Sequence, residues 1–244
     1  MTSPLPSIPA SSDGTPSPRE LVFEGVGVDL AGVNVLRDVT VTLPQRRIAV
    51  IGSNGSGKST FARLLGGLVA PTRGRVVIHG LDLVSERKQV LRMVGSVFSN
   101  PDAQIIMPTV AEDVAFSLRR RGLTREEIAQ RVTTTLERYG LAERADAPAH
   151  SLSGGQKQLL ALSAVLITDP ALIVADEPTA LLDGRNSRLI SALLLDEIPQ
   201  QIVLVTHDLE LAARCDVAVR FDDGRLLEAD EPASVIARYR RDLG

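Results

Sequence analysis

A run of small and polar residues at positions 52 to 60 could bind a phosphate group. It consists of Gly52, Ser53, Asn54, Gly55, Ser56, Gly57, Lys58, Ser59 and Thr60, directly after the apolar run Ile48–Ile51. Glycines let a backbone curl so that several N–H groups face one anion, and the start of a helix adds its positive dipole end. Lys58 could reach the β- and γ-phosphates of a nucleotide, and the Ser59 hydroxyl could ligate Mg²⁺. The run predicts a nucleoside triphosphate site (P-loop); a glycine turn with an incidental lysine is the alternative.

The residues after this loop predict the helix that must position it. Phe61, Leu64, Leu65 and Leu68 recur at helical spacing, which is typical of an amphipathic helix packed on a sheet. A buried strand, a glycine loop and a helix therefore follow one another in the order that phosphate binding requires.

A second candidate anion site lies at Ser153, Gly154, Gly155 and Gln156, which we call the signature segment. A hydroxyl and backbone N–H groups stand there at the expected start of a helix, before the apolar run Leu159–Ile167. The alternative is a serine that only caps its own helix. One γ-phosphate does not need two such sites in one chain.

Three further candidate residues follow apolar runs that resemble strands. Asp176 and Glu177 follow Ala171–Ala175, and His207 follows Ile202–Thr206. Asp176 could hold Mg²⁺ through water, and Glu177 could orient or deprotonate an attacking water. A lone histidine at the position of His207 is usually a surface residue or the start of a helix. The alternative is that these polar side chains simply meet solvent where strands end.

These motifs, in this order, resemble the ATPases of the ABC transporter family over about residues 20 to 230. The resemblance adds a D-loop ending at Asp183 and implies a P-loop NTPase fold: a RecA-like α/β core, an antiparallel β subdomain and an inserted helical subdomain. It implies ATP and Mg²⁺ as cofactors. It also implies that His207 is the switch histidine that senses the γ-phosphate. It also implies head-to-tail pairing with a second copy or a homologous ATPase, so that Ser153 faces the partner's ATP.

The segment around Pro101, Asp102 and Gln104 resembles the ATPases of energy-coupling factor transporters, most of all those of biotin transporters. The resemblance implies a peripheral protein on the cytoplasmic face of the membrane. Its partners would be an integral membrane coupling subunit and a substrate-binding membrane subunit. Cobalt or nickel import, and a soluble ABC ATPase for complex assembly, are the alternatives. Locally, Pro101 and Asp102 could instead just begin a helix.

Three stretches depart from the family pattern. In one of them, Gln45, Arg46 and Arg47 replace the usual Gly-Glu turn before the core strand, and the other two concern the site. Ser99 stands where most ABC ATPases have a glutamine that ligates Mg²⁺, so it could reach the ion only through water, and Gln104 could take part of its role at the coupling interface. Leu30 stands where an aromatic side chain usually stacks on adenine, which predicts weaker selectivity for the base.

Composition supports one α/β domain of moderate size. The chain has 244 residues, 44% of them apolar, and a net charge of −3, which argues against a broad basic surface for nucleic acid. A single cysteine, Cys215, argues against a disulfide framework and is expected to be a small buried side chain. No apolar run is long enough to predict a membrane span, and the first residues lack the apolar core of a signal peptide.

We expect a disordered Pro- and Ser-rich tail at 1–18, an ABC ATPase domain at 19–230 with its helical subdomain at about 101–160, and a C-terminal helix at 231–244. Alternating apolar residues predict antiparallel strands within 22–41, and a hairpin is expected at 217–228. Capping boxes at Thr109 and Thr124 predict helices at about 110–121 and 125–139. Three arginines of the last helix, Arg238, Arg240 and Arg241, are expected to form a solvated face.

Overall fold

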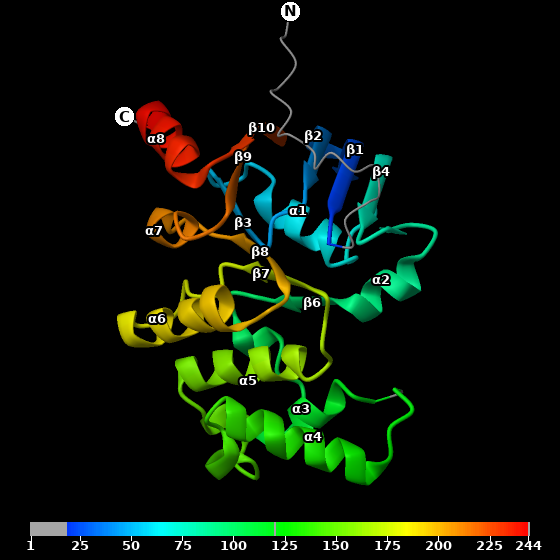
Figure 1. Ribbon diagram of the computed structural model, residues 1–244, viewed down its shortest axis with the longest axis vertical. Helices are drawn as coiled ribbons and strands as arrows, with labels where there is room; N and C mark the ends of the chain where they lie inside the picture. The colour runs from blue at the N-terminus through cyan, green and yellow to red at the C-terminus, as the bar shows by residue number, and fades with distance from the viewer. Residues whose placement is uncertain (1–18, 120, 244) are drawn as a thin grey trace, which may run out of the picture. The chain divides into compact units, whose positions relative to one another are not determined.

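The computed structural model describes residues 19–119 and 121–243 (Figure 1). The expected tail at 1–18 lies outside the described residues. The chain divides into two compact units. The first unit comprises the residues up to Arg92 together with those from Gln201 onward, and the second comprises Met93–Gln200.

An antiparallel sheet forms one layer of the first unit. Strand β1 (Leu21–Leu30) pairs with β2 (Val33–Leu43) on one side and with β4 (Arg73–Ile78) on the other, and β5 (Leu81–Asp82) pairs with β4. Figure 1 shows β1, β2 and β4 side by side. The antiparallel strands expected within 22–41 are confirmed.

The second sheet of this unit carries the phosphate-binding loop. Its strands are ordered β10 (Arg225–Asp230), β9 (Val217–Asp222), β3 (Arg47–Gly52) and β8 (Gln201–Val205), and β3 is parallel to both β8 and β9. Residues Ile48–Ile51 are all fully buried, as expected of a parallel strand covered on both faces. The antiparallel β9–β10 hairpin confirms the one expected at 217–228.

Helix α1 (Lys58–Leu65) follows the loop and packs through one aromatic side chain. The Phe61 ring lies 4.8 Å from the Phe23 ring in β1 and 5.0 Å from the Phe221 ring in β9, measured between centroids. Since Phe61 is fully buried, it joins both sheets of the first unit to the helix that begins at Lys58.

The prediction that Leu68 lies on the packed face of this helix is wrong. The side chain is 58% exposed, because α1 ends at Leu65 and is followed by Gly66 and by Gly67 with a φ of 65°. A left-handed glycine stops the helix before the helical spacing reaches Leu68. Helix α2 (Arg87–Met93) returns to this point, where Arg87 donates a 2.8 Å hydrogen bond to the Gly67 carbonyl.

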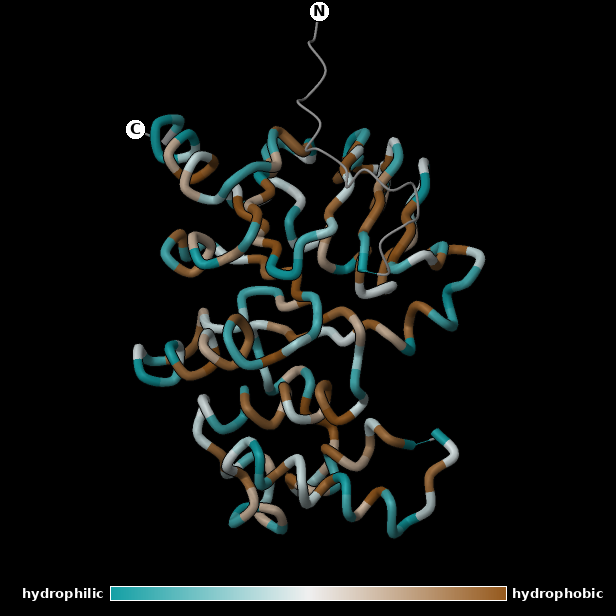
Figure 2. The backbone as a smooth tube through the Cα atoms, in the orientation of Figure 1, coloured by the Kyte–Doolittle hydropathy of each residue, from teal (hydrophilic) through white to brown (hydrophobic). Residues whose placement is uncertain are grey.

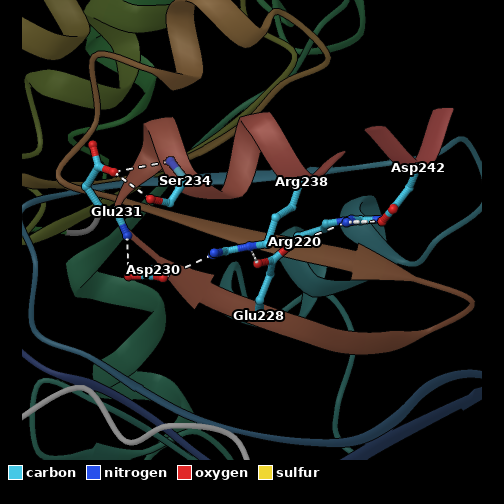
Figure 3. Close-up of polar contacts among 7 residues, drawn as sticks. All are labelled: Arg220, Glu228, Asp230, Glu231, Ser234, Arg238 and Asp242. Carbon is cyan, nitrogen blue, oxygen red and sulfur yellow. Dashed lines mark hydrogen bonds and ion pairs between the residues drawn. The ribbon is translucent and has the colours of Figure 1, made fainter. Parts of the chain in front are cut away.

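Helix α8 (Pro232–Leu243) is held to the β9–β10 hairpin by ion pairs (Figure 3). Arg238 contacts both Glu228 and Asp230, and Arg220 contacts Glu228 at 3.4 Å and Asp242 at 2.6 Å. The Arg238 side chain stays 39% exposed, as expected of a solvated face, but it also pairs with two carboxylates of β10. Figure 2 shows both hydrophobic and hydrophilic residues along this helix, and Val235 and Ile236 are buried.

The second unit pairs a short parallel sheet with a helical bundle. Strand β6 (Val94–Val97) is parallel to β7 (Leu172–Asp176). The helices are α3 (Val110–Phe116), α4 (Arg125–Arg138), α5 (Gly154–Leu166) and α6 (Gly184–Ala192), which continues as a π-helical turn at Leu193–Glu197. Short 3-10 turns lie at Pro101–Ala103, Ala142–Arg144 and Ala149–Ser151. A buried apolar cluster joins α3, α4 and α5 through Val114, Leu136 and Leu160.

Both predicted capping boxes are present. Thr109 caps α3 with Glu112, and Thr124 caps α4 with Glu127. The helix expected at 110–121 ends at Phe116, because the amides of Leu118 and Arg119 bond three residues back, to Ala115 and Phe116, in a tightened turn. Capping thus fixes the starts of helices better than it fixes their ends.

Two expectations from composition can be compared with the described part of the chain. Cys215 is buried, and burial raises the pKa of its thiol to about 12, which suits a side chain that only packs. Within residues 19–119 and 121–243, no helix has the length and apolar character needed to cross a membrane.

Candidate functional site

The predicted P-loop folds around the Lys58 ammonium. Nζ of Lys58 donates 2.8 Å hydrogen bonds to the carbonyls of Gly52 and Ser53, so the loop closes on its own lysine. Gly57 precedes α1 with a φ of 101°, and no side chain caps this helix. A helix start without a side-chain cap, beside a lysine, is the chemistry expected of a phosphate site.

Neighbouring strands hold this loop in place. The Ser53 hydroxyl donates to Asp222 Oδ1 at 3.1 Å, and the Gly224 amide donates to the Ser56 carbonyl at 3.1 Å. Gly52 has a φ of 147°, and a Cβ built there would lie 2.1 Å from the Phe221 carbonyl oxygen. Only glycine fits this position, where β3 ends against β9.

His207 lies at the same edge of the sheet as the P-loop. Strands β3 and β8 are parallel with Val50 opposite Val205, so Gly52 ends β3 and His207 follows β8 on the same side. The Thr206 amide donates to the Val50 carbonyl at 3.1 Å, which fixes the chain just before the histidine. His207 is exposed. Its role as a γ-phosphate sensor stays a prediction.

The second unit brings Ser99 and the two acidic candidates to one edge in the same way. Val97 in β6 lies opposite Ala175 in β7, so Ser99 follows one strand while Asp176 and Glu177 end the other. Glu177 has a φ of 50°, a left-handed conformation that is uncommon for glutamate. Backbone strain of this kind is concentrated at functional sites, which agrees with a catalytic role for Glu177.

The signature segment begins helix α5. Ser153 accepts a hydrogen bond from the Gln156 amide at 3.4 Å, and the Gln156 side chain accepts one from the Ser153 amide at 3.0 Å. The cap proposed as an alternative is therefore real. It places the exposed Ser153 at a helix N-terminus without excluding a ligand there, and binding to a partner's ATP stays a prediction.

Asp183 of the predicted D-loop caps helix α6. Its carboxylate accepts hydrogen bonds from the amides of Arg185 and Asn186, and the Asn186 bond is the largest cause that lowers its pKa. Asn186 in turn packs on the signature segment, because a Cβ on Gly155 would lie 2.3 Å from its side chain. The D-loop and the signature segment are thus joined through one close contact between α5 and α6.

The side chain of Gln104 forms two hydrogen bonds within the second unit. Its Nε2 donates to the Ser96 carbonyl at 3.1 Å, and its Oε1 accepts from the Phe98 amide at 3.3 Å. Pro101 and Asp102 begin a 3-10 turn capped by Asn100, so the local alternative for this motif is confirmed as a structural fact. A role for Ser99 and Gln104 at a coupling interface stays a prediction.

A pocket of about 310 Å³ lies beside this turn. Its lining consists of Asp102, Ile105, Ile106, Met107, Pro108, Ala149 and His150. Ile106 is 61% exposed, although it is a large apolar side chain. Exposed apolar side chains around a hollow are typical of a surface that binds another protein.

The sequence reasoning missed two residues that organise this region. Gln158, fully buried in α5, donates to the Phe98 carbonyl, and Lys157 pairs with Asp102 at 2.7 Å. A glutamine inside the apolar run of a helix was the available signal for Gln158. The partner of Lys157 is 55 positions away, so no local pattern indicates it.

The comparison with protein families decides the class. The ABC transporter family model matches residues 36–180. The chain belongs to the ABC transporter family of ATPases. This assignment agrees with the predicted fold class, a P-loop NTPase with an antiparallel β sheet and a helical part.

Three relatives of this ABC ATPase carry more specific names. The biotin transport ATP-binding protein BioM of Rhizobium etli is 47% identical, over 89% of this chain and 96% of that protein. The energy-coupling factor ATPase EcfA1 of Halalkalibacterium halodurans is 37% identical (89% and 81%). The nickel import ATP-binding protein NikO of Rhodobacter capsulatus is 40% identical (88% and 91%).

Solved ABC ATPases have the same fold. The structure of cbiO1 from Clostridium perfringens, part of the ABC transporter complex cbiONQ, matches with a TM-score of 0.80 at 30% identity, over 90% of this chain and 92% of that one. A dimeric ATP-binding cassette bound to ADP and Pi matches with a TM-score of 0.73 at 26% identity, over 87% and 98%.

Proposed function

We propose that this ABC ATPase powers the import of a vitamin, with biotin as the favoured substrate, through an energy-coupling factor transporter. The similarity to BioM along nearly the whole chain is the observation that carries the proposal. The similarity to EcfA1 supports the transporter class. The phosphate-binding geometry around Lys58 supplies the chemistry by which such a transporter is driven.

The roles proposed for the site residues follow from their positions. Lys58 and the amides of the P-loop bind the phosphates of ATP, and His207 contacts the γ-phosphate. Glu177 orients or deprotonates the attacking water. The Ser59 hydroxyl is a hard oxygen ligand of the kind that Mg²⁺ prefers, and Asp176 would hold the ion through water, because Mg²⁺ takes few direct protein ligands besides phosphates and water. Bound there, Mg²⁺ would neutralise developing negative charge on the phosphates.

Two ATPase subunits are proposed to act together. Ser153 and the first amides of α5 would bind the γ-phosphate of ATP held by the partner, which is a second copy of the chain or a homologous ATPase. The matching cassette that was solved as a dimer supports this arrangement. ATP would favour the closed pair and ADP would not, and this difference in affinity provides the energy for transport.

The pocket beside Asp102 is the proposed docking surface for an integral membrane coupling subunit. A separate membrane subunit would bind the substrate. Apolar side chains at Ile105, Ile106 and Met107 would receive an apolar helix of that subunit. This contact would keep the ATPase on the cytoplasmic face of the membrane as a peripheral protein.

Replacing Ile106 by glutamate should weaken this docking about tenfold or more, because a charge would enter an apolar contact. The measurement is the fraction of protein that remains on membrane vesicles prepared from the cells that carry its gene. Val84→Glu is a matched control, since Val84 is 60% exposed and lies outside the pocket. Equal retention of both variants would contradict the docking surface.

The proposed substrate can be tested by uptake. Cells that lack the gene should take up radiolabelled biotin at the background rate, and the wild-type chain should restore uptake while Glu177→Gln should not. A parallel measurement uses ⁶³Ni²⁺, because the similarity to NikO favours nickel as the second candidate. Restoration of nickel uptake alone would overturn the biotin assignment, and restoration of neither would count against both substrates.

A further inference from the structure

Two glutamine side chains bind the backbone of one residue of the second unit, Phe98, one at its amide and one at its carbonyl. Gln104 Oε1 accepts from the Phe98 amide at 3.3 Å, and Gln158 Nε2 donates to the Phe98 carbonyl at 3.3 Å. Gln104 comes from the chain just after the 3-10 turn, whereas Gln158 comes from helix α5. Phe98, the residue immediately before Ser99, is therefore held by the chain after the 3-10 turn, through Gln104, and by helix α5, through Gln158.

Gln158 is costly for the fold. It is fully buried, and its Oε1 has no hydrogen-bond partner among the described residues. A buried amide oxygen without a partner destabilises a protein, whereas a leucine of similar size could fill the space without that cost. The bond to Phe98 is thus obtained at the expense of stability, which indicates a positioning role rather than a packing role.

A second contact joins the same two elements at the surface. Lys157, the residue before Gln158, forms a 2.7 Å ion pair with Asp102 in the 3-10 turn. The Asp102 amide also donates to Asn100 Oδ1 at 3.0 Å, which fixes the turn that presents its carboxylate. Two consecutive residues of α5 therefore bind this segment. Gln158 binds the Phe98 carbonyl, and Lys157 binds the Asp102 carboxylate.

We propose that these contacts make the segment Phe98–Gln104 and the first turns of α5 a single mechanical element, in which Gln104 and Gln158 are positioning residues. A helix is stiff over this distance, so a displacement of the segment beside the docking pocket would move Ser153 at the start of α5. The inference rests on the proposed function for the role of Ser153, while the joined element itself is a property of this chain alone.

The test compares Gln158→Leu with the wild type in the full chain by hydrogen–deuterium exchange. The amides of Ala103 and Gln104, which bond within the turn, should exchange about tenfold faster in the variant, because loss of one bond loosens the turn. The melting temperature should stay equal or rise. Ser163→Ala is the matched control: its buried hydroxyl donates only within α5, to Leu159, and these amides should keep their protection.

Steady-state kinetics give an independent readout. Gln158→Leu should lower kcat for ATP about tenfold while KM changes less than about twofold, because the signature segment is displaced but the P-loop is not. Gln104→Leu should have the same effect, and Gln104→Glu, which keeps the acceptor for the Phe98 amide, should recover part of it. A parallel fall in kcat and melting temperature would indicate a merely structural role and overturn the proposal.

The ion pair is tested by exchanging its charges. Asp102→Lys and Lys157→Asp should each speed exchange of the turn amides, and the double variant should restore their protection. Unchanged exchange in Gln158→Leu, or no recovery in the double variant, would overturn the inference. A wild-type chain that hydrolyses no ATP would instead count against the proposed function. The hydrogen–deuterium exchange of the turn amides would still test whether the segment and α5 are joined.

Discussion

Glu177→Gln should bind ATP as the wild type does and lose ATP turnover by about 10³-fold, because an amide cannot take a proton from the attacking water. The substitution keeps the size of the side chain and the backbone with its φ of 50°, so the fold should be unaffected. Steady-state phosphate release gives the rate, and light scattering of the ATP complex gives the mass. ATP that is not hydrolysed should hold two chains together.

Glu143→Gln provides the control for this experiment, since Glu143 is an exposed acid of the second unit, in the 3-10 turn at Ala142–Arg144. It should turn over ATP at the wild-type rate and show no stable ATP-bound dimer. If Glu177→Gln keeps more than about a tenth of the wild-type rate, the glutamate is not the base. A monomeric ATP complex would count against two chains sharing the nucleotide.

Gly52→Ala should lower the free energy of unfolding by about 3 kcal/mol or more, because overpacking against backbone is among the costliest single changes. The new methyl group would lie 2.1 Å from the Phe221 carbonyl oxygen and 2.9 Å from Ser56 Oγ. To relieve this contact β3 must move away from β9, which also displaces the Gly52 carbonyl bonded to Lys58. Urea denaturation measures the loss, and ATP binding should weaken with it.

The matched control is Gly80→Ala. Gly80 also has a positive φ, of 82°, but a Cβ there would meet nothing within 4 Å. Its cost should be only the strain of a left-handed alanine, about 1 kcal/mol. If both variants lose the same stability, the contact with Phe221 does not explain why position 52 is glycine.

The sequence was sufficient where a structure depends on neighbouring residues. The P-loop, the two capping boxes and the β9–β10 hairpin each depend on groups a few residues apart, and all are found where the pattern predicts them. The parallel strands could also be predicted to bring chemistry to their carboxyl ends, because such ends meet at one edge of a sheet.

The sequence did not predict features that depend on residues far apart in the chain. Leu68 has the spacing of a core residue, but the helix ends before it. Arg238 is partly exposed, as the sequence predicts, but no local pattern indicates its two carboxylate partners in β10. The left-handed backbone of Glu177 and the clamp around Phe98 likewise follow from tertiary contacts rather than from composition or periodicity.

The bracing of the P-loop by the β9–β10 hairpin has an energetic consequence. Because Asp222 and Gly224 already hold Ser53 and Ser56 in place, the arrival of a nucleotide requires little ordering of this segment. Little conformational entropy is then lost on association. More of the attraction between protein and phosphates then remains as net binding free energy.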